Sequence, residues 1–544
     1  MVETHYGAIW EAVADALPDE VAVVQGARRY TWAQYEQRAA RLAQCLLEGG
    51  LGPHARVGMY LYNSPEYCET NFAAMKIRGV PININYRYLD QELAYLLDNA
   101  DAEALVYHSS LADRVARVRG QVPGLKLLIE VDDGPCADGR HDVAGALRYE
   151  DIQANARPAA RIKPEGDELY ILYTGGTTGM PKGVTYSMLE FTRFFYQSYP
   201  TMFGKPPLES TAQLLDAARA RAAAGSPLVA MSAPPLMHGT GCWLGMMAPH
   251  MLGGATVFLE GRGLDPIELW DTIARERVQQ LIIVGDAFAR PMLRALDAEP
   301  KRWDLSCMQA IISSGAMWSL EVKRAMLEHL PQVALADLLG STEGGMGQSL
   351  MTRDTPDNET AKFALRPTTK VFTDDGREVQ PGSGEVGMVA NGGMVPLRYH
   401  KDEEKSARTF RTINGQRYSF PGDMATVEAD GSITLLGRGS NCINTGGEKV
   451  FPEEVEEILK RHAAVEDALV FGEADEQFGQ RVVAVASLKP GAQATAEAIM
   501  AEARTQLASY KLPKRLVLVP HTPRAPNGKA DYVTAKALFA AAAP

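Results

Sequence analysis

Tyr170-Ile-Leu-Tyr-Thr-Gly-Gly-Thr-Thr-Gly-Met-Pro-Lys-Gly-Val184 joins an apolar, β-prone run to a loop of glycines and threonines that closes at a lysine. Glycine lets the backbone approach a phosphate closely, and successive N–H groups form an anion-binding nest. Threonine hydroxyls and a lysine add donors and positive charge. A polar surface turn would also use glycine, but three threonines followed by Pro-Lys-Gly favour a phosphate site. It is not the common P-loop, because no Gly-Lys-Ser/Thr follows a four-residue spacer.

The composition is that of a globular chain with more than one domain. A chain of 544 residues is too long to fold around a single hydrophobic core. Its content of 46% apolar and 22% charged residues argues against disorder. A net charge of −12 gives no general attraction to nucleic acid or to an acidic membrane, so an anionic ligand needs a local site. The six cysteines lack metal-binding spacing and are expected to be reduced. No signal peptide and no apolar run of ~20 residues is evident, so we expect a cytoplasmic protein without a transmembrane segment.

Helix and strand signals alternate along the first two-thirds of the chain. A capping-box pattern at Thr31 and Gln34 begins one predicted helix, and Ser64-Pro65 begins another. The alternation predicts a mostly parallel sheet covered by helices. Residues 204–227 are expected to form a surface insertion beside the substrate entrance. Strands are predicted at 56–61, 79–84, 228–232, 255–259, 280–284 and 309–313, and helices at 89–99, 265–277, 286–297 and 319–330.

The composition changes after about residue 365, where Gly, Asp and Pro punctuate short strands. Proline followed by acids, with bases in the last turn, predicts a helix from Pro452 to His462. Strands at 467–471, 481–488 and 514–519 and a helix near 496–508 would complete a small α+β domain. We therefore predict a large domain over residues 1–438 and a small one over 439–544.

Four further motifs follow the glycine loop: Leu339-Gly-Ser-Thr-Glu343, Pro421-Gly-Asp423, Gly437-Arg438 with Gly446-Gly447, and Pro526-Asn-Gly-Lys529. In order and spacing the five motifs resemble the adenylate-forming (ANL) superfamily, which includes acyl-CoA synthetases, firefly-type luciferases and peptide-synthetase adenylation domains. The resemblance covers essentially the whole chain. It implies an α/β fold with a large N-terminal domain of stacked β-sheets covered by helices, and a small, mobile C-terminal α+β domain.

The resemblance also implies the chemistry, in which a carboxylate attacks the α-phosphate of ATP. Because two anions must meet, catalysis depends on positioning and on charge around the phosphorus. Thr342 would contact the α-phosphate, and Glu343 with Thr174 would contact Mg²⁺, which suits a metal completed by phosphates and water. The other implied nucleotide-binding residues are Thr174, Gly175, Gly176, Thr177, Thr178, Gly179 and Lys182 at the β- and γ-phosphates, Gly315, Ala316, Asp337, Leu339 and Gly340 around adenine, and Asp423 and Arg438 at the ribose.

Lys529 is the residue for which the sequence predicts the most specific catalytic role. By the resemblance, this late lysine enters the site from the small domain and neutralises the forming pentavalent phosphate. A lone lysine near a chain end is otherwise a solvated surface residue, and the Pro-x-x-Gly-Lys context distinguishes this one.

Two positions depart from the family pattern. Leu339 stands where the family usually has a tyrosine that stacks on adenine, and leucine can still pack there. Ser440 stands where the hinge residue is usually Asp or Lys, which puts the energetics of domain rotation in doubt.

Weaker similarities indicate which carboxylic acid is activated and which thiol accepts the acyl group. Pro235-Leu-Met-His238-Gly239 matches the segment that lines the acyl site, and no nearby Asp is present to hold an α-ammonium group. The loop at Gly446, Gly447 and Lys449 resembles the lining of the pantetheine tunnel in CoA ligases. Lys449, Arg481 and Lys511 are candidates for pairing with CoA phosphates, and sequence alone leaves the choice open.

The resulting hypothesis is an AMP-forming acyl-CoA synthetase that uses ATP, Mg²⁺ and coenzyme A. Its similarity to fatty-acyl and sterol side-chain CoA ligases favours a bulky lipophilic acid. An aryl-acid or short-chain CoA ligase, a non-catalytic nucleotide sensor and a luciferase-like oxidase are the alternatives. The oligomeric state stays open, with a homodimer as one option.

Overall fold

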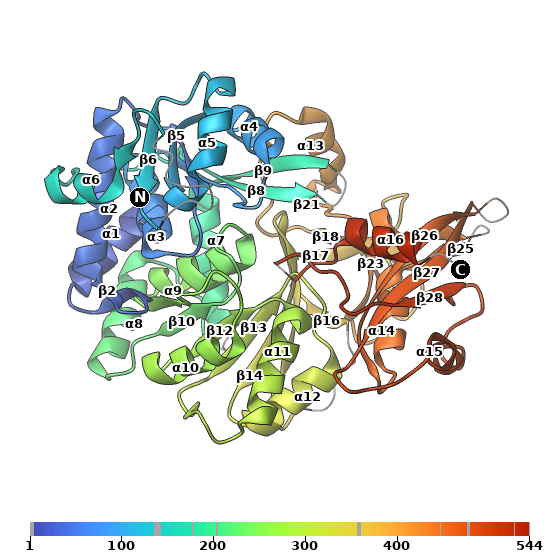
Figure 1. The fold of residues 1–544 in the computed structure, drawn as a ribbon. Coiled ribbons are helices and arrows are strands. Elements are labelled where there is room, and N and C mark those ends of the chain that lie inside the picture. Colours follow the sequence, from blue (N-terminus) through green and yellow to red (C-terminus); the bar gives the residue numbers. More distant parts are fainter. Residues whose placement is uncertain are drawn as a thin grey trace.

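The computed structural model describes residues 5–134, 143–176, 179–202, 205–355, 361–445, 448–475, 479–526 and 528–542. Within them the predicted α/β architecture is confirmed, with a large mixed sheet, further sheets and helices, and a separate small C-terminal sheet (Figure 1). The predicted site residues Thr177, Thr178, Gly446 and Gly447 lie outside the described residues.

The longest sheet has one antiparallel strand pair at its edge, continues with parallel strands and ends with antiparallel ones. Helices α10 (Pro266–Glu276), α11 (Gly285–Ala298) and α12 (Leu320–His329) pack on the parallel part and bury a core around Trp270 and Trp318. The strand order is β2 (Arg28–Thr31), β1 (Val21–Gln25), β11 (Ala255–Phe258), β10 (Val229–Ser232), β12 (Gln280–Ile283), β13 (Ala310–Ser314), β14 (Ala334–Ser341), β15 (Gly344–Met351), β16 (Lys362–Leu365), β23 (Ile433–Arg438), β22 (Asp423–Val427), β18 (Val386–Asn391), β21 (Gln416–Ser419) and β20 (Phe410–Ile413), and β17 (Thr369–Phe372) pairs with β18.

A second, five-stranded sheet is parallel throughout and is built from the first 150 residues. The predicted capping box is present, since the Thr31 hydroxyl accepts from the Gln34 N–H and the Gln34 side chain accepts from the Thr31 N–H. The strand order is β4 (Val80–Asn83), β3 (Arg56–Tyr60), β5 (Ala102–His108), β6 (Leu127–Val131) and β7 (Leu147–Arg148), and the accompanying helices are α1 (Tyr6–Ala16), α2 (Trp32–Glu48), α3 (Pro65–Lys76), α4 (Asp90–Asn99), α5 (Ala112–Val118) and α6 (Tyr149–Asn155).

The phosphate-loop stretch forms the antiparallel hairpin of β8 (Leu169–Gly176) and β9 (Gly179–Ser187), and β19 (Arg398–Tyr399) pairs with β9 as a third strand. Helix α7 (Met188–Thr201) follows this hairpin. Pairing with β19 brings residues near 400 beside residues near 184, although they are far apart in the sequence.

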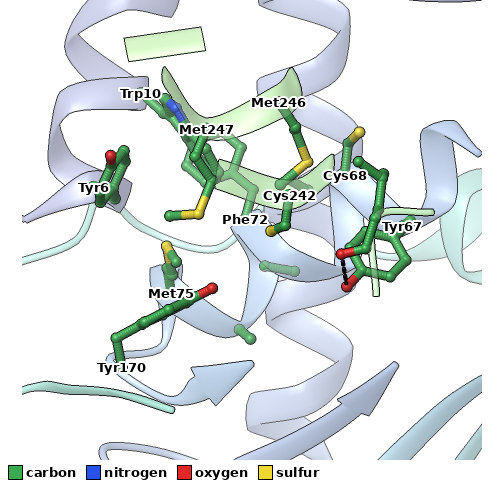
Figure 2. Packing of buried hydrophobic residues seen from close by; sticks show 14 of the residues in the cluster. Tyr6, Trp10, Tyr67, Cys68, Phe72, Met75, Tyr170, Cys242, Met246 and Met247 are labelled. Carbon is green, nitrogen blue, oxygen red and sulfur yellow. Dashed lines mark hydrogen bonds between the residues drawn. The ribbon is translucent and has the colours of Figure 1, made fainter. Parts of the chain in front are cut away.

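A π-helix over Thr240–Met247 runs into α9 (Ala248–Met251) and joins the largest core to the cavity. Its Cys242, Met246 and Met247 pack among Tyr6 and Trp10 from α1 (Figure 2). π-helical turns are rare and frequently lie at functional sites.

The predicted surface insertion over residues 204–227 contains a helix that packs on the largest core. Within it, α8 (Thr211–Ala223) packs against α1 and buries Leu214 and Ala218 in the largest core. No described residue of the insertion lines either of the two main cavities.

The small domain has its own five-stranded sheet and its own core around Val455 and Val470. It lies at one side of the large domain, in orange and red in Figure 1. Among the described residues, no helix combines the length and the apolar character that crossing a membrane would require. The elements of this part are β24 (Ile443–Thr445), β25 (Glu448–Val450), α14 (Pro452–Lys460), β26 (Val465–Asp475), β27 (Gly479–Leu488), α15 (Ala496–Ala503), β28 (Arg515–Leu518) and α16 (Tyr532–Ala541), and α13 (Glu403–Thr409) belongs to the large domain.

Candidate active site

One cavity gathers eight of the site residues predicted from sequence. Thr174 at the end of β8, His238 before the π-helix, Gly315 after β13, Thr342 after β14 and Lys529 from the small domain all line it. Ligands of open α/β sheets bind beyond the carboxyl ends of the parallel strands, and β13 and β14 end here. The cavity is therefore the candidate active site. The predicted residues Gly239, Leu339 and Gly340 line it as well.

Lys529 reaches the cavity from a turn of the small domain. A methyl group added at Gly315 would lie 3.9 Å from the Lys529 Cε, which places the lysine side chain against the end of β13. Arg524 holds the turn, because it pairs with Asp467 at 2.6 Å and donates to the Gly528 carbonyl at 3.2 Å. The surrounding protein lowers the pKa of Lys529 by removing water, and the Arg438 cation lowers it further.

An irregularity in the sheet precedes Thr342, which lines the cavity, and its neighbour Glu343. The register of β14 against β15 shifts between Leu339 and Gly340, and such bulges re-aim the residues that follow. The Tyr186 hydroxyl then donates to the Thr342 carbonyl at 2.6 Å, and the Tyr399 hydroxyl donates to Glu343 Oε1 at 2.7 Å.

Two lysines meet beside the phosphate loop. Lys182 pairs with Thr174 across the β8–β9 hairpin, and its Nζ lies 5.5 Å from the centre of the Tyr399 ring. The Nζ of Lys405, on α13, lies 5.8 Å from the same ring centre. Burial and then the Lys405 cation lower the pKa of Lys182 to about 8. Within the described residues neither lysine has a carboxylate at ion-pair distance, so the pair presents unneutralised positive charge.

Sequence reasoning missed Lys405 and Tyr399. Lys405 follows Asp402-Glu-Glu and has the pattern of a solvated helix face, so no local signal marked it. Only the pairing of β19 with β9 brings both residues to the phosphate loop.

Asp423 and Arg438 oppose each other across β22 and β23. The Arg438 Nε lies 3.5 Å from Asp423 Oδ1, while the buried Oδ2 has no hydrogen-bond partner among the described residues. Burial raises the pKa of Asp423, an effect that Arg438 partly offsets. A buried carboxylate oxygen without a partner is unfavourable unless a ligand donates to it, and this open acceptor fits a ribose hydroxyl.

His238 is a neutral imidazole at the cavity wall. Burial, and to a lesser degree the Lys529 cation, lowers its pKa to about 3. Its Nε2 has no hydrogen-bond partner among the described residues. The ring can therefore give or take a neutral hydrogen bond with a ligand but does not add charge.

The outer part of the cavity is aromatic and apolar, with one exception. Arg366 projects into it, and its Cζ lies 5.1 Å from the centre of the Phe194 ring. Burial lowers the pKa of Arg366, although an arginine stays charged at neutral pH. The apolar lining consists of Leu172, Phe194, Phe195, Tyr199, Met202, Trp243, Leu244 and Met394.

Several predicted residues do not line this cavity, among them Gly175, Lys182, Glu343, Asp423 and Arg438. Asp337 forms a buried ion pair with Lys323 at 2.9 Å and does not line the cavity, and neither does Ala316. Of the candidates for CoA phosphates, Arg481 pairs with Glu473 at 2.7 Å and Lys511 pairs with Glu454 at 2.6 Å. Lys449 lies in β25.

A second cavity, of about 610 Å³, opens between the large domain and the turn that carries Lys529. The rings of Tyr62 and Tyr86 lie 4.5 Å apart at its wall, and the Arg262 Cζ lies 4.4 Å from the Tyr62 ring centre. Arg28 and Arg524 also line it. Two tyrosine rings in contact beside arginines suit a ligand that carries both an aromatic base and phosphates.

The donor set fits a magnesium ion held mainly by a nucleotide. Among the described residues no group of three or more His, Cys, Asp or Glu side chains could enclose a metal. Glu343 and the Thr174 hydroxyl would supply two protein oxygens, and Mg²⁺ bound this way keeps waters and phosphates as its other ligands.

Comparison with known proteins gives two family matches. The model of the AMP-binding enzyme matches residues 10–394, and that of the AMP-binding enzyme C-terminal domain matches residues 454–529. A 3-oxocholest-4-en-26-oate–CoA ligase of Rhodococcus rhodochrous is 42% identical over 535 residues, covering 97% of this chain and 94% of that protein. A medium/long-chain-fatty-acid–CoA/3-oxocholest-4-en-26-oate–CoA ligase of Mycolicibacterium smegmatis is 39% identical over 534 residues, covering 97% and 95%.

Solved structures share the fold along the whole chain. The anthranilate CoA ligase AuaEII in complex with anthranoyl-AMP superposes with a TM-score of 0.82 at 22% identity, covering 100% of this chain and 99% of that chain. A benzoate CoA ligase from Burkholderia xenovorans LB400 superposes with a TM-score of 0.81 at 20% identity, covering 97% and 99%.

Proposed function

This chain belongs to the AMP-binding enzyme family, and we propose that it is an AMP-forming acyl-CoA synthetase for a bulky lipophilic acid. The resemblance inferred from the five motifs is thereby confirmed. The observation that carries the proposal is the position of Lys529, which the small domain inserts into the cavity that Thr174, Thr342 and His238 line. A nucleotide sensor without catalysis would have no use for a lysine placed at this point.

In the first half-reaction, a carboxylate oxygen of the acid forms a bond to the α-phosphorus of ATP, and the bond to the β-phosphate oxygen breaks. Lys529 neutralises the charge that develops on the α-phosphate, and Thr342 orients it. Asp423 accepts from the ribose through its open Oδ2. Mg²⁺ bound at Glu343 would supply charge neutralisation between the phosphates.

Lys405 joins Lys182 as a second cation for the leaving pyrophosphate in this proposal. Two ammonium groups over one tyrosine ring repel each other, and an anion between them would offset that repulsion. Their place beside the β8–β9 hairpin is where the β- and γ-phosphates would lie.

In the second half-reaction, the thiol sulfur of CoA attacks the acyl carbonyl carbon and AMP leaves. The second cavity supports an approach of CoA from this side, with Tyr62 and Tyr86 for the adenine ring and Arg28 and Arg262 for phosphates. Ion pairing does not separate these candidates from Arg481 and Lys511, since Arg28 pairs with Glu66 and Arg262 pairs with Asp133, each at 2.6 Å. The second cavity is what favours Arg28 and Arg262. Rotation of the small domain about the segment near Arg438 would withdraw Lys529 between the two steps.

The lipophilic acid is inferred from two observations. The outer cavity wall is built from Phe194, Tyr199, Trp243 and other apolar side chains. The relatives from Rhodococcus rhodochrous and Mycolicibacterium smegmatis are named for steroid side-chain acids and fatty acids.

The test is a thioester-forming screen with the full chain, ATP, Mg²⁺ and CoA over fatty, steroidal, aromatic and short-chain acids. We expect pyrophosphate release and acyl-CoA formation, with kcat/KM highest for fatty or steroidal acids. A preference for aryl or short-chain acids would refute the substrate class. Absence of pyrophosphate release with every acid would refute the reaction.

A further inference from the structure

Arg366 is the one cationic side chain from the large domain that lines the candidate active-site cavity, among the residues that the structure describes. It follows β16, and its backbone is fixed, because its N–H donates to the Met346 carbonyl and its carbonyl accepts from the Thr369 N–H. A methyl group added at Gly345 would lie 3.3 Å from the Arg366 Cζ. Because Gly345 has no side chain, there is room beside it for the Arg366 guanidinium.

The guanidinium has no polar partner within the described part of the chain. It forms no ion pair and no side-chain hydrogen bond there, and its one specific contact is with the face of the Phe194 ring. Arg438 and Arg524, which lie near the same site, pair with Asp423 and Asp467. Arg366 is half-buried, and its nitrogens are not among the fully buried atoms without a partner, so water can reach them until a ligand covers them. A ligand that displaces this water is favoured if it accepts hydrogen bonds from the guanidinium.

A purely hydrocarbon acid does not explain this arrangement. Its chain would displace water from the guanidinium and would supply no acceptor in return. An oxygen on the acid would satisfy the planar donor fork, which suits a carbonyl or a carboxylate. In the proposed reaction the reacting carboxyl group meets the α-phosphate, to which Lys529 and Thr342 are assigned, and both residues line the same cavity as Arg366.

We propose that Arg366 binds an oxygen acceptor, either a ketone or a second carboxylate, that the acid carries away from the carboxyl group to be activated. This proposal rests on the proposed function and deepens it, because it makes Arg366 a specificity-determining residue for oxygen-bearing lipophilic acids.

The test compares matched acids on the wild type and on Arg366→Met and Arg366→Lys. Each set contains a plain fatty acid, its oxo derivatives with the ketone at successive positions, and the dicarboxylic acid of equal length. A steroidal pair with and without a ring ketone forms a further set. The measured quantity is the ratio of kcat/KM for each oxygen-bearing acid to that for its plain counterpart, from pyrophosphate release in the presence of CoA.

We expect the wild type to prefer at least one oxygen-bearing acid, because a bound plain acid leaves the Arg366 donors without an acceptor. Arg366→Met should reduce that preference by about tenfold or more. The kcat/KM of Arg366→Met for the plain acid should be unchanged or higher, which also shows that the variant folds. A preference for the ketone identifies a carbonyl as the partner, and one for the diacid identifies a carboxylate. Arg366→Lys should retain part of the preference.

Arg411 provides the matched control. Its Cζ lies 3.7 Å from the centre of the Phe420 ring, and burial likewise lowers its pKa, but it does not line the cavity. Arg411→Met should leave the ratio unchanged.

Three results would overturn the proposal while leaving the acyl-CoA synthetase activity established. The wild type could activate plain acids with no preference for any oxygen-bearing acid. Arg366→Met could reduce kcat/KM equally for all acids, which would assign Arg366 to the reacting carboxyl group or to the fold. A raised KM for ATP with an unchanged acid ratio would assign Arg366 to the nucleotide.

Discussion

The hydroxyl of Tyr399 donates a hydrogen bond to Glu343 Oε1 at 2.7 Å, and the face of the same ring lies 5.5 Å from the Lys182 Nζ. One tyrosine thus contacts the proposed metal ligand and a proposed phosphate ligand. Because strand β19 carries Tyr399 and pairs with β9, which carries Lys182, the arrangement depends on this strand pairing.

Tyr399→Phe should raise the Mg²⁺ concentration needed for half-maximal adenylation by about 10- to 100-fold, as loss of a group that orients a metal ligand typically does. The ring that lies under the lysines is retained, so the KM for ATP at saturating Mg²⁺ should change little. The control is Tyr107→Phe, which removes a hydroxyl that donates to Glu130 at 3.2 Å in another core. An unchanged Mg²⁺ requirement in Tyr399→Phe would contradict the role of Glu343.

Lys405→Met should weaken pyrophosphate binding, measured as product inhibition and as ATP formation from acyl-adenylate, by about 10- to 100-fold, the range for losing a charged hydrogen bond. Thioester formation from supplied acyl-adenylate should be unaffected, because pyrophosphate has already left. Arg408→Met is the control, since Arg408 lies on the same helix α13 and pairs with Glu404 at 2.9 Å. Equal loss in both half-reactions would show that Lys405 supports the fold.

The KM for ATP should rise as the pH increases through about 8. The pKa of Lys182 is lowered to about 8 by burial and by the neighbouring Lys405, and a lysine is charged below its pKa. The cation that binds phosphate is therefore present at lower pH and lost above this value. In Lys405→Met the rise should occur at higher pH, because one cause of the lowering is gone. A KM profile identical in wild type and variant would contradict the coupling of the two lysines.

Lys529→Ala should slow adenylation by about 10²–10³, the usual effect of removing one transition-state donor. It should spare thioester formation from supplied acyl-adenylate, since the lysine acts at the α-phosphate. Lys536→Ala, at another lysine of the small domain, should leave both steps unchanged. Equal loss of both half-reactions in Lys529→Ala would contradict the assignment.

Asp423→Asn should reduce the preference for ATP over its 2′-deoxy and 3′-deoxy analogues by about tenfold, because one charged acceptor of the ribose hydroxyls is lost. The measurement is kcat/KM for each nucleotide with one acid. Asp430→Asn serves as control, since Asp430 pairs with Lys362 on the surface at 3.1 Å. Unchanged nucleotide preference would remove Asp423 from the ribose site.

Local patterns predicted the elements well where side-chain periodicity and caps decide structure. The strand predicted at 280–284 is β12 (Gln280–Ile283), and the Thr31 capping box begins α2 as expected. The helix predicted to 508 ends at Ala503, and the π-helix over Thr240–Met247 was not predicted. Both depend on packing against distant residues, which a local window does not contain.

The sequence by itself determined the family and the α/β class, and it predicted roles for Lys529, Glu343 and Asp423, because all of these depend on residue types at fixed spacing within short motifs. Only the tertiary structure decided that Lys405 and Tyr399 lie beside the phosphate-loop hairpin, that Arg366 lines the candidate active-site cavity, and that Arg262 with Tyr62 lines a second cavity. Those contacts join residues that are up to hundreds of positions apart in the sequence. The charges of these side chains interact strongly only after folding has removed the side chains from water.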